Sequence, residues 1–273
     1  MKPLKLFVIV VLAAAVTGCF ENRRNTDQLC KDNPKLRCER MNQNDGQCKL
    51  PRTKLIWHRY DSFRNPSDVM LIKEYALTAE YKKCIELASQ IQTIDQADLR
   101  RKRFNALVNA GEDLETLVEE IRKSSSPDAL YFLWSQTGDE SARRSFLQLE
   151  GKPALETAEM QYALATFYTS RDLEKTIKLL NKSLELSDGD NLNTDIFKSL
   201  ASINYQLNQK EQAYVWAMVA SAFEVPVIAS TQEMKLLYGF SEDKYDQLDD
   251  IADDIKSALD SGKYKRSMMP KFN

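Results

Sequence analysis

Small and aliphatic side chains recur at helical spacing in two segments of the chain, and this pattern restricts the fold more than any other feature of the sequence. The positions are Thr176, Leu180 and Ser183 in the first segment, and Ala213, Ala217 and Ala220 in the second. Residues three and four apart share one face of an α-helix, and small side chains on that face allow a second helix to approach closely. Ala213 follows Thr176 by 37 residues, so the pattern also repeats along the chain. The sequence therefore predicts repeated pairs of packed helices.

Residues 157–190 resemble a tetratricopeptide repeat, in which two antiparallel helices interlock. Phe167 stands where that motif needs an aromatic residue late in its first helix. The next segment repeats the arrangement, with Phe197, Leu200 and Ala201 on one face of a first helix. The offset of 37 residues is close to the usual period of about 34. The resemblance implies a stack of helix pairs.

Earlier helix pairs fit the motif less closely. We expect one pair within residues 71–91, with Tyr75 in the first helix and Cys84 at a small-residue position of the second. Another pair follows at 104–121, and a shortened pair at 127–151. With only eight glycines and eight prolines, the chain has little turn material for a many-stranded sheet. The expected fold is all-α, a tetratricopeptide-like helical-repeat array of about five helix pairs.

The two ends of the chain differ from the repeats in composition. Residues 19–64 are polar and carry cysteines, so we expect an N-terminal cap there, before a repeat domain at 65–223. Residues 224–273 suit capping helices, which shield the last apolar face of a stack. The tail from Gly262 is basic, and we expect it to be loose.

Residues 1–18 resemble the signal peptide of a bacterial lipoprotein. Lys2 and Lys5 precede an apolar run too short to span a bilayer comfortably, and the residues before Cys19 resemble a lipobox. The resemblance implies that Cys19 becomes the first mature residue and carries covalent lipid, with no other cofactor. Phe20, rather than an aspartate, follows it, which implies an outer-membrane location facing the periplasm. The alternatives are an ordinary cleaved signal and an uncleaved anchor.

Four further cysteines follow Cys19, namely Cys30, Cys38, Cys48 and Cys84. An even number in an oxidising compartment predicts two disulfides, and three pairings are open. We favour a long-range link to Cys84, because it would fasten the cap to the helical body. A buried free thiol at Cys84 is the alternative. The spacing fits neither a Cys-x-x-Cys redox motif nor a usual zinc site, so we expect no metal.

No residue pattern in the sequence predicts catalysis. His58 is the only histidine, and its neighbours Trp57 and Arg59 favour a packed ring over a catalytic triad. Acidic pairs at 249–250 and 253–254 could serve a glycosidase, yet on a helix they would face solvent opposite apolar residues. The sequence contains neither a Gly-rich phosphate loop nor a His-Glu-x-x-His motif. We therefore expect no catalytic residue.

Candidate partner-binding residues lie on the expected first helices, which line the concave groove of such stacks. Tyr168 and Tyr205 occupy equivalent places beside the core positions of successive first helices. Gln161, Lys198 and Gln206 would add hydrogen bonds to a bound peptide or protein segment. Core packing of the two tyrosines is the alternative.

Residues 51–60 and the cysteine-bearing region resemble a family of tetratricopeptide-type lipoproteins from gammaproteobacteria that has no established activity. Loss of Lys2 and Lys5 with the signal leaves 36 basic residues against 40 acidic ones, so nucleic acid is not an expected partner. The sequence predicts a non-enzymatic periplasmic adaptor or assembly factor whose partner is an envelope protein or peptide segment. The alternatives are a cell-envelope hydrolase acting on cell wall and a passive structural lipoprotein.

Overall fold

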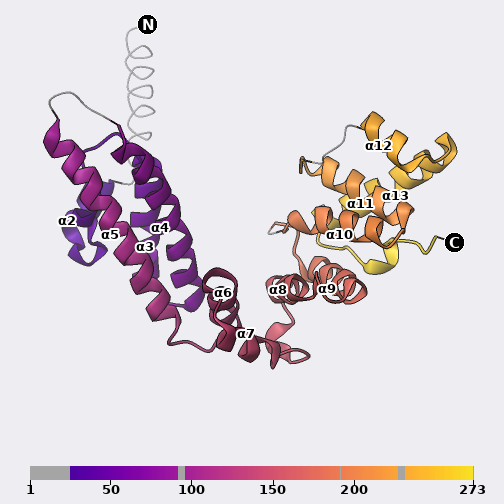
Figure 1. Ribbon diagram of the computed structural model, residues 1–273, viewed down its shortest axis with the longest axis horizontal. Helices are drawn as coiled ribbons and strands as arrows, with labels where there is room; N and C mark the ends of the chain where they lie inside the picture. The colour runs from indigo at the N-terminus through magenta and orange to yellow at the C-terminus, as the bar shows by residue number, and fades with distance from the viewer. Residues whose placement is uncertain (1–24, 92–95, 191, 227–230, 273) are drawn as a thin grey trace, which may run out of the picture. The chain divides into compact units, whose positions relative to one another are not determined.

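The computed structural model describes residues 25–91, 96–190, 192–226 and 231–272 (Figure 1). Every regular element in these ranges is a helix, so the predicted all-α fold class is confirmed. The chain divides into two compact units, residues 1–125 and residues 126–273. Cys19 and the expected signal peptide lie outside the described residues.

Unit 1 contains three long helices and a short N-terminal segment that carries cysteines (Figure 1). Its elements are α2 (Thr26–Asp32), η1 (Pro34–Leu36), η2 (Cys38–Arg40), α3 (Lys49–Arg64), α4 (Asp68–Ser89) and α5 (Ala97–Ile121). Helix α4 packs along both α3 and α5. Tyr81 and Ile85 on its inner face are almost completely buried, which places α4 at the centre of the core of unit 1.

Two of the predicted helix pairs are wrong, because each segment forms one continuous helix. Helix α4 runs through most of residues 71–91, and α5 runs through residues 104–121. A turn between paired helices needs residues that stop a helix, and neither proline nor glycine stands between Tyr75 and Cys84. Gly111 is the single glycine inside α5, and one glycine costs a helix only about 1 kcal/mol relative to alanine.

Two disulfides hold the N-terminal segment together and join it to α4. Cys30 pairs with Cys38 inside the segment, and Cys48 at the start of α3 pairs with Cys84 in α4. Both disulfides expected from the sequence are therefore present, and the long-range link to Cys84 is one of them. The two bonds close loops of very different length, since their partners are 8 and 36 residues apart.

Buried ion pairs connect the long helices with one another and with the N-terminal segment. Arg59 of α3 donates hydrogen bonds to Glu74 at 2.8 Å and to Asp113 at 2.7 Å. Arg103 of α5 donates to both carboxylate oxygens of Asp45, at 2.6 and 3.0 Å. At most a tenth of each of these side chains is exposed. A buried charge is costly unless it is paired, so these contacts help to fix how α3 meets α4 and α5 and how the segment meets α5.

Unit 2 is built from successive helix pairs followed by C-terminal helices (Figure 1). Its elements are α6 (Pro127–Thr137), α7 (Glu140–Leu147), η3 (Pro153–Leu155), α8 (Ala158–Tyr168), α9 (Leu173–Leu186), α10 (Asp195–Gln206), α11 (Lys210–Ala222), α12 (Thr231–Tyr238), α13 (Glu242–Asp260) and η4 (Arg266–Met268). Helices α6 and α7 pack together, as do α8 with α9 and α10 with α11. The shortened pair expected within 127–151 corresponds to α6 and α7.

The small residues that repeat along the sequence lie between the paired helices. Thr176 and Ser183 of α9 are at most 2% exposed, and the Ser183 hydroxyl donates to the Ala158 carbonyl oxygen of α8 at 2.7 Å. Ala213 and Ala220 of α11 are completely buried. The spacing noted in the sequence therefore marks the faces along which the helices of unit 2 pack.

The C-terminal helices close one end of unit 2. Helix α13 packs against α11 through Leu248, Ile255 and Leu259, each of which is at most 1% exposed. The expectation of a loose tail after Gly262 is wrong for the residues described. Tyr264 is 1% exposed and fixes the tail against unit 2, because a buried aromatic ring outweighs the solubility of its basic neighbours.

A close backbone approach joins the α9–α10 loop to the end of α13. A Cβ atom at Gly189 would lie 2.7 Å from the Asp260 carbonyl oxygen, and one at Gly262 would lie 2.8 Å from the Asp188 carbonyl oxygen. Both glycines also have positive φ angles, +91° and +63°. Any side chain at either position would therefore meet both backbone strain and a steric clash.

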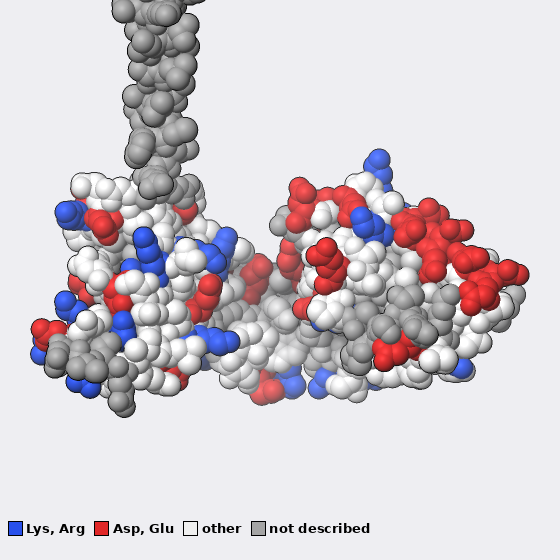
Figure 2. Space-filling view, turned by 90° about the horizontal axis from the view of Figure 1, so that it is seen from above, with Lys and Arg blue, Asp and Glu red and all other residues white. Residues whose placement is uncertain are grey.

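Acidic side chains gather on unit 2 in the face shown in Figure 2. Helix α13 carries many of the exposed acids of this unit, namely Glu242, Asp243, Asp246, Asp250, Asp253, Asp254 and Asp260. Asp249 on the same helix is partly buried and accepts a hydrogen bond from the Tyr214 hydroxyl at 2.9 Å. The acidic pairs at 249–250 and 253–254 are thus divided between a solvated helix face and one contact with α11.

Candidate binding pocket

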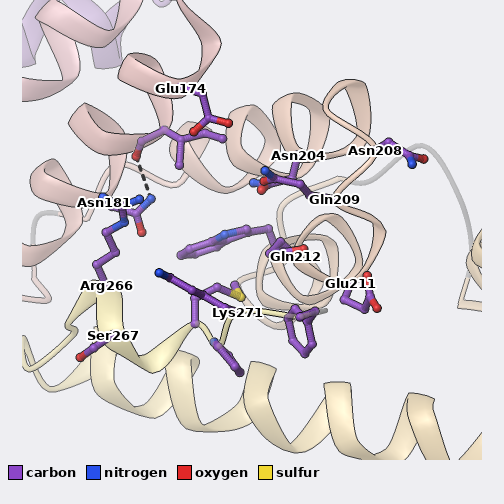
Figure 3. Close-up of a pocket in the computed structure, with 15 residues that line it drawn as sticks. Glu174, Asn181, Asn204, Asn208, Gln209, Glu211, Gln212, Arg266, Ser267 and Lys271 are labelled. Atoms are coloured by element: carbon purple, nitrogen blue, oxygen red, sulfur yellow. Dashed lines mark hydrogen bonds between the residues drawn. The ribbon is translucent and has the colours of Figure 1, made fainter.

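A pocket of about 880 Å³ lies within unit 2, between α9, the turn from α10 to α11, α11 itself and the C-terminal tail (Figure 3). Carboxamide side chains make up much of its lining, namely Asn181, Asn204, Asn208, Gln209 and Gln212. Each carboxamide can donate and accept hydrogen bonds without carrying a charge. The pocket therefore offers a dense set of neutral hydrogen-bonding groups.

Two buried asparagines of the pocket are held in fixed orientations. The Nδ2 atom of Asn181 donates to the Ile177 carbonyl oxygen at 2.7 Å, and that of Asn204 donates to the Leu200 carbonyl oxygen at 2.7 Å. Because a carbonyl oxygen can only accept, each contact turns the Oδ1 atom of the asparagine away from its own helix backbone. The Oδ1 of Asn181 then accepts the Tyr264 hydroxyl at 2.6 Å.

The equivalent oxygen of Asn204 hydrogen-bonds no residue in the part of the chain that the structure describes, although Asn204 is only 3% exposed. The indole N–H of Trp216, a residue only 2% exposed, is likewise without a partner among the described residues. Neither atom is sealed from solvent, and both residues line the pocket. The pocket therefore presents one acceptor and one donor, on two largely buried side chains, that remain open for a ligand or water.

Two aromatic rings pack against the indole of Trp216. Phe197 stacks on it with ring centroids 6.1 Å apart and an interplanar angle of 11°. Tyr264 meets it edge to face at 5.9 Å. These neighbours cover the aromatic surface, so the N–H group is the part of Trp216 that is suited to binding.

Charged side chains at the pocket are balanced. Glu174 and Glu211 contribute two carboxylates, and Arg266 and Lys271 contribute two cations. Figure 3 shows Arg266 and Lys271 on the side of the tail and Glu174 and Glu211 on the side of the helices. The charged side chains of the lining therefore sum to no net formal charge, which favours a neutral ligand over a strongly acidic or basic one.

The C-terminal tail forms one wall of the pocket because Tyr264 anchors it. The Tyr264 phenol is buried, and burial raises its pKa above the ordinary value of 10. The backbone N–H of Arg266 donates to a carboxylate oxygen of Glu185 at 2.8 Å, which adds a second attachment to α9. Met269, which also lines the pocket, has an extended backbone. The wall therefore consists of residues of η4 and of the extended backbone that follows it.

None of the five partner-binding candidates from the sequence lines this pocket. Tyr168 is partly buried and donates to Glu150 at 2.6 Å, while the Lys175 ammonium lies 3.7 Å from its ring centre. Burial alone would raise the pKa of the Glu150 carboxyl, but hydrogen bonds from Lys175 and Tyr168 lower it overall. Tyr168 is thus part of a polar contact between α8, α9 and the turn before η3.

The other candidates divide between the interior and one exposed helix face. Gln161 is 5% exposed, and its amide donates to a backbone carbonyl oxygen of the preceding turn at 2.8 Å. Lys198, Tyr205 and Gln206 are exposed on α10. Tyr205 is 47% exposed and meets the Tyr238 ring edge to face at 6.0 Å. The structure therefore brings three of the five candidates together on the surface of α10.

His58 is packed between α3 and α4. It is 7% exposed, and its Nε2 atom lies 2.8 Å from the Met70 carbonyl oxygen. Because the carbonyl can only accept, Nε2 carries the proton in this contact. The packed ring expected from its sequence neighbours agrees with this placement.

The described residues contain neither a metal-binding cluster nor a candidate membrane span. No group of three or more His, Cys, Asp or Glu side chains in that part of the chain is arranged to hold a metal ion. No helix in the described ranges is both long enough and apolar enough to span a membrane.

Asn181, Asn204 and Trp216 were not among the residues singled out from the sequence. One sequence feature could have indicated the two asparagines, namely a carboxamide next to an apolar residue of a helix. Asn181 follows Leu180, and Asn204 follows Ile203. An amide on a buried face needs a partner, which is a reason to expect a polar contact or a site there. The sequence gives no indication that residues of α9, α10, α11 and the tail meet around one space.

Comparison with known proteins gives a family but no activity. Residues 16–218 match the model of a protein family described as "Protein of unknown function (DUF2989)", which covers most of the chain. The matched range ends inside α11, so it includes Asn181, Asn204 and Trp216. No curated protein and no solved structure matches the chain.

Proposed function

The chain belongs to the DUF2989 family of proteins of unknown function, and from its own residues we propose that it is a non-enzymatic protein-binding adaptor or assembly factor. In this proposal the helix pairs of unit 2 are a tetratricopeptide-like scaffold. The partner is a protein or peptide segment of the cell envelope. No bond is made or broken, and no cofactor other than covalent lipid is required.

The pocket of unit 2 is the observation that supports this proposal best. It is lined by neutral carboxamides, and the Oδ1 of Asn204 and the N–H of Trp216 have no partner among the described residues. Unpartnered donors and acceptors of this kind fix the orientation of a bound molecule. The exposed residues of α10, which include Tyr205, provide a second contact surface of the type that aromatic anchors favour.

We propose that lipid on Cys19 holds the protein at the outer membrane, facing the periplasm. The support is the sequence of residues 1–19, which resembles a lipoprotein signal. Asn25 follows Cys19 by six positions, and a chain of that length spans at most about 20 Å. The anchor would therefore keep unit 1 close to the membrane and raise the local concentration of any bound partner there.

Crosslinking in living cells tests the proposal. The tagged protein is crosslinked, purified from the outer membrane and analysed by mass spectrometry, beside Tyr168→Ala and Tyr205→Ala variants and a Phe63→Ala control. Phe63 is a suitable control because it is an exposed aromatic residue of unit 1, whereas both candidate surfaces belong to unit 2. We expect a dominant envelope partner that is retained by the control and lost in the Tyr205→Ala variant.

Two results would count against an adaptor. Absence of a specific partner under several growth conditions would reject it in favour of a passive structural lipoprotein. Release of fragments from purified cell wall by the same preparation would reject it in favour of a hydrolase. Recovery of the protein from the soluble periplasm would reject only the lipid anchor.

A further inference from the structure

Two side chains in the pocket, one with an acceptor atom and one with a donor atom, have no hydrogen-bond partner for these atoms among the described residues. The Oδ1 atom of Asn204 can only accept, and the indole N–H of Trp216 can only donate. Both residues are at least 97% buried, and their positions are fixed, the first by the Leu200 carbonyl oxygen and the second by the stacked Phe197 ring. Leaving such groups without a hydrogen bond costs free energy. A ligand that forms hydrogen bonds with both atoms should therefore bind more tightly than one that forms none.

We propose that this pocket binds the backbone of an uncharged polypeptide segment. Trp216 Nε1 donates to a backbone carbonyl oxygen of the segment, and Asn204 Oδ1 accepts a backbone N–H. Polypeptide backbone fits because every residue except proline supplies one donor and one acceptor. The inference rests on the proposed protein-binding function and states what part of the partner is recognised.

The lining beyond these two residues agrees with an extended, neutral segment. Gln209 and Gln212 add carboxamides that can pair with further backbone groups. The two carboxylates and two cations of the lining give no net formal charge, so the pocket has no bias toward a charged sequence. Its wall on one side is formed by η4 and by the residues that follow it, which begin with the extended Met269.

An N-acetylated sugar of the cell wall also contains an amide, but the pocket suits it less well. A sugar ring places its apolar face on an aromatic face, and the ring of Trp216 is covered by Phe197 and Tyr264. Trp216 is only 2% exposed, so its indole offers a sugar little apolar area. The observations therefore favour a polypeptide.

Nuclear magnetic resonance of the tryptophan indole N–H groups tests the inference. The full chain, purified as the cell processes it and carrying isotope-labelled tryptophan, is titrated with N-acetyl-tetraalanine-N′-methylamide and, separately, with chitotriose. We expect the alanine probe to shift the Trp216 signal and to leave that of Trp57 unchanged. Trp57 is an internal control because its indole N–H already donates to the Thr26 hydroxyl at 3.0 Å. The Trp216 signal is assigned with a Trp216→Phe variant.

Ester analogues of the probe identify the role of Asn204. Each amide N–H of the peptide is replaced in turn by an ester oxygen, which cannot donate to Asn204. One replacement should weaken binding about threefold to tenfold, as the loss of one hydrogen bond does. In an Asn204→Leu variant the amide and that ester should bind equally, since the acceptor is gone. If this variant fails to fold, the amide-to-ester ratio in the parent protein still decides the question.

Three results would overturn the inference. They are an unchanged Trp216 signal at saturating peptide concentration, equal binding of the amide and every ester, and a shift with chitotriose alone. Crosslinking in cells distinguishes failure of this inference from failure of the proposed function. If the Asn204→Leu variant still captures the partner, the adaptor proposal stands and the partner binds at another surface.

Discussion

Two guanidinium groups, those of Arg52 and Arg103, donate hydrogen bonds to Asp45 in the N-terminal segment. Arg103 donates to both of its carboxylate oxygens, and Arg52 donates to its backbone carbonyl oxygen at 3.0 Å. The hydrogen bond from Arg103 lowers the pKa of the Asp45 carboxyl from 3.8 to about 2. Only 5% of each side chain in the Asp45–Arg103 pair is exposed, so solvent screens the contact little.

Replacing this carboxylate should weaken unit 1 markedly. We expect Asp45→Asn to lower the free energy of unfolding by about 3 kcal/mol at neutral pH, because Arg103 would be left buried without its counter-charge. Urea unfolding followed by circular dichroism measures the change. The matched control is Asp98→Asn, which breaks an exposed pair with Arg101 and should have little effect. Equal losses in both variants would show that burial does not set the energy of the Asp45 pair.

The Asp45–Arg103 pair also predicts part of the loss of stability at acid pH. A carboxyl whose folded pKa lies below its unfolded value stabilises the protein fully above the unfolded pKa and loses this effect as the pH falls toward the folded pKa. Between about pH 4 and pH 2 the parent should therefore lose about 2 kcal/mol that the Asp45→Asn variant does not lose. Parallel urea titrations across this range measure the difference. If the unfolding free energies of the parent and the variant fall by the same amount across this range, the pKa of Asp45 is not lowered.

At the scale of elements, the two disulfides should contribute unequally. The Cys48–Cys84 bond joins residues 36 apart, whereas the Cys30–Cys38 bond joins residues 8 apart. From loop closure alone we expect replacement of the first pair by serines to cost about 4 kcal/mol, and replacement of the second about 2.5 kcal/mol. Urea midpoints of the two double variants give the comparison. A larger loss from the short loop would show that native contacts, rather than the unfolded chain, dominate.

The contact between the α9–α10 loop and the end of α13 has little tolerance for side chains. We expect Gly189→Ala to destabilise unit 2 by at least about 2 kcal/mol, since the new Cβ meets the Asp260 carbonyl oxygen and φ is positive. Thermal unfolding of the variant measures the loss. Gly151→Ala is the control for strain, because φ there is +78° but no atom lies within 4 Å of a Cβ. Gly151→Ala should destabilise the protein less than Gly189→Ala does. Equal losses of stability would mean that backbone strain alone explains the effect at Gly189.

Spacing on one helix face predicted the elements of unit 2 better than those of unit 1. Ala213 and Ala220 are buried where the sequence placed them, because small residues at helical spacing have few uses other than close packing. Within residues 71–91 the same type of spacing gave a false pair, since a long helix satisfies it equally well when no glycine or proline interrupts the run. The expectation of a loose tail came from its charge, but the buried Tyr264 and the hydrogen bond from the Arg266 N–H to Glu185 fix the tail.

The candidate site was harder to foresee than the fold. Tyr205 is exposed on α10 as expected, but Gln161 is buried, because helical spacing alone does not say which side of α8 faces a neighbour. The pocket depends on contacts between residues far apart in the sequence, such as Tyr264 with Asn181. No local pattern specifies such a contact.

Across the whole molecule, the two units differ in charge. Residues 1–125 contain 22 basic and 17 acidic residues, and residues 126–273 contain 16 basic and 23 acidic ones. Unit 2 is therefore negatively charged, with α13 as one exposed source of that charge. A negative field slows the approach of acidic molecules and speeds that of basic ones, most strongly at low salt.

The two units should respond differently to a reductant. All disulfides lie in unit 1, and each unit has its own buried core, so we expect two calorimetric unfolding transitions. Dithiothreitol should lower the midpoint of one transition and leave the other unchanged. The Gly189→Ala variant identifies the insensitive transition as that of unit 2. A single transition that moves as a whole under reductant would mean that the units unfold together.

The pairing of the cysteines follows their order along the chain, first with second and third with fourth after Cys19. If the chain is exported from its N-terminus and Cys19 carries lipid, as proposed, Cys30 and Cys38 reach the oxidising compartment first, and Cys84 is the one thiol left for Cys48. An oxidase acting on thiols as they appear would therefore form the native bonds directly. Thiol reshuffling, which takes seconds to hours, would not be needed for this protein to mature.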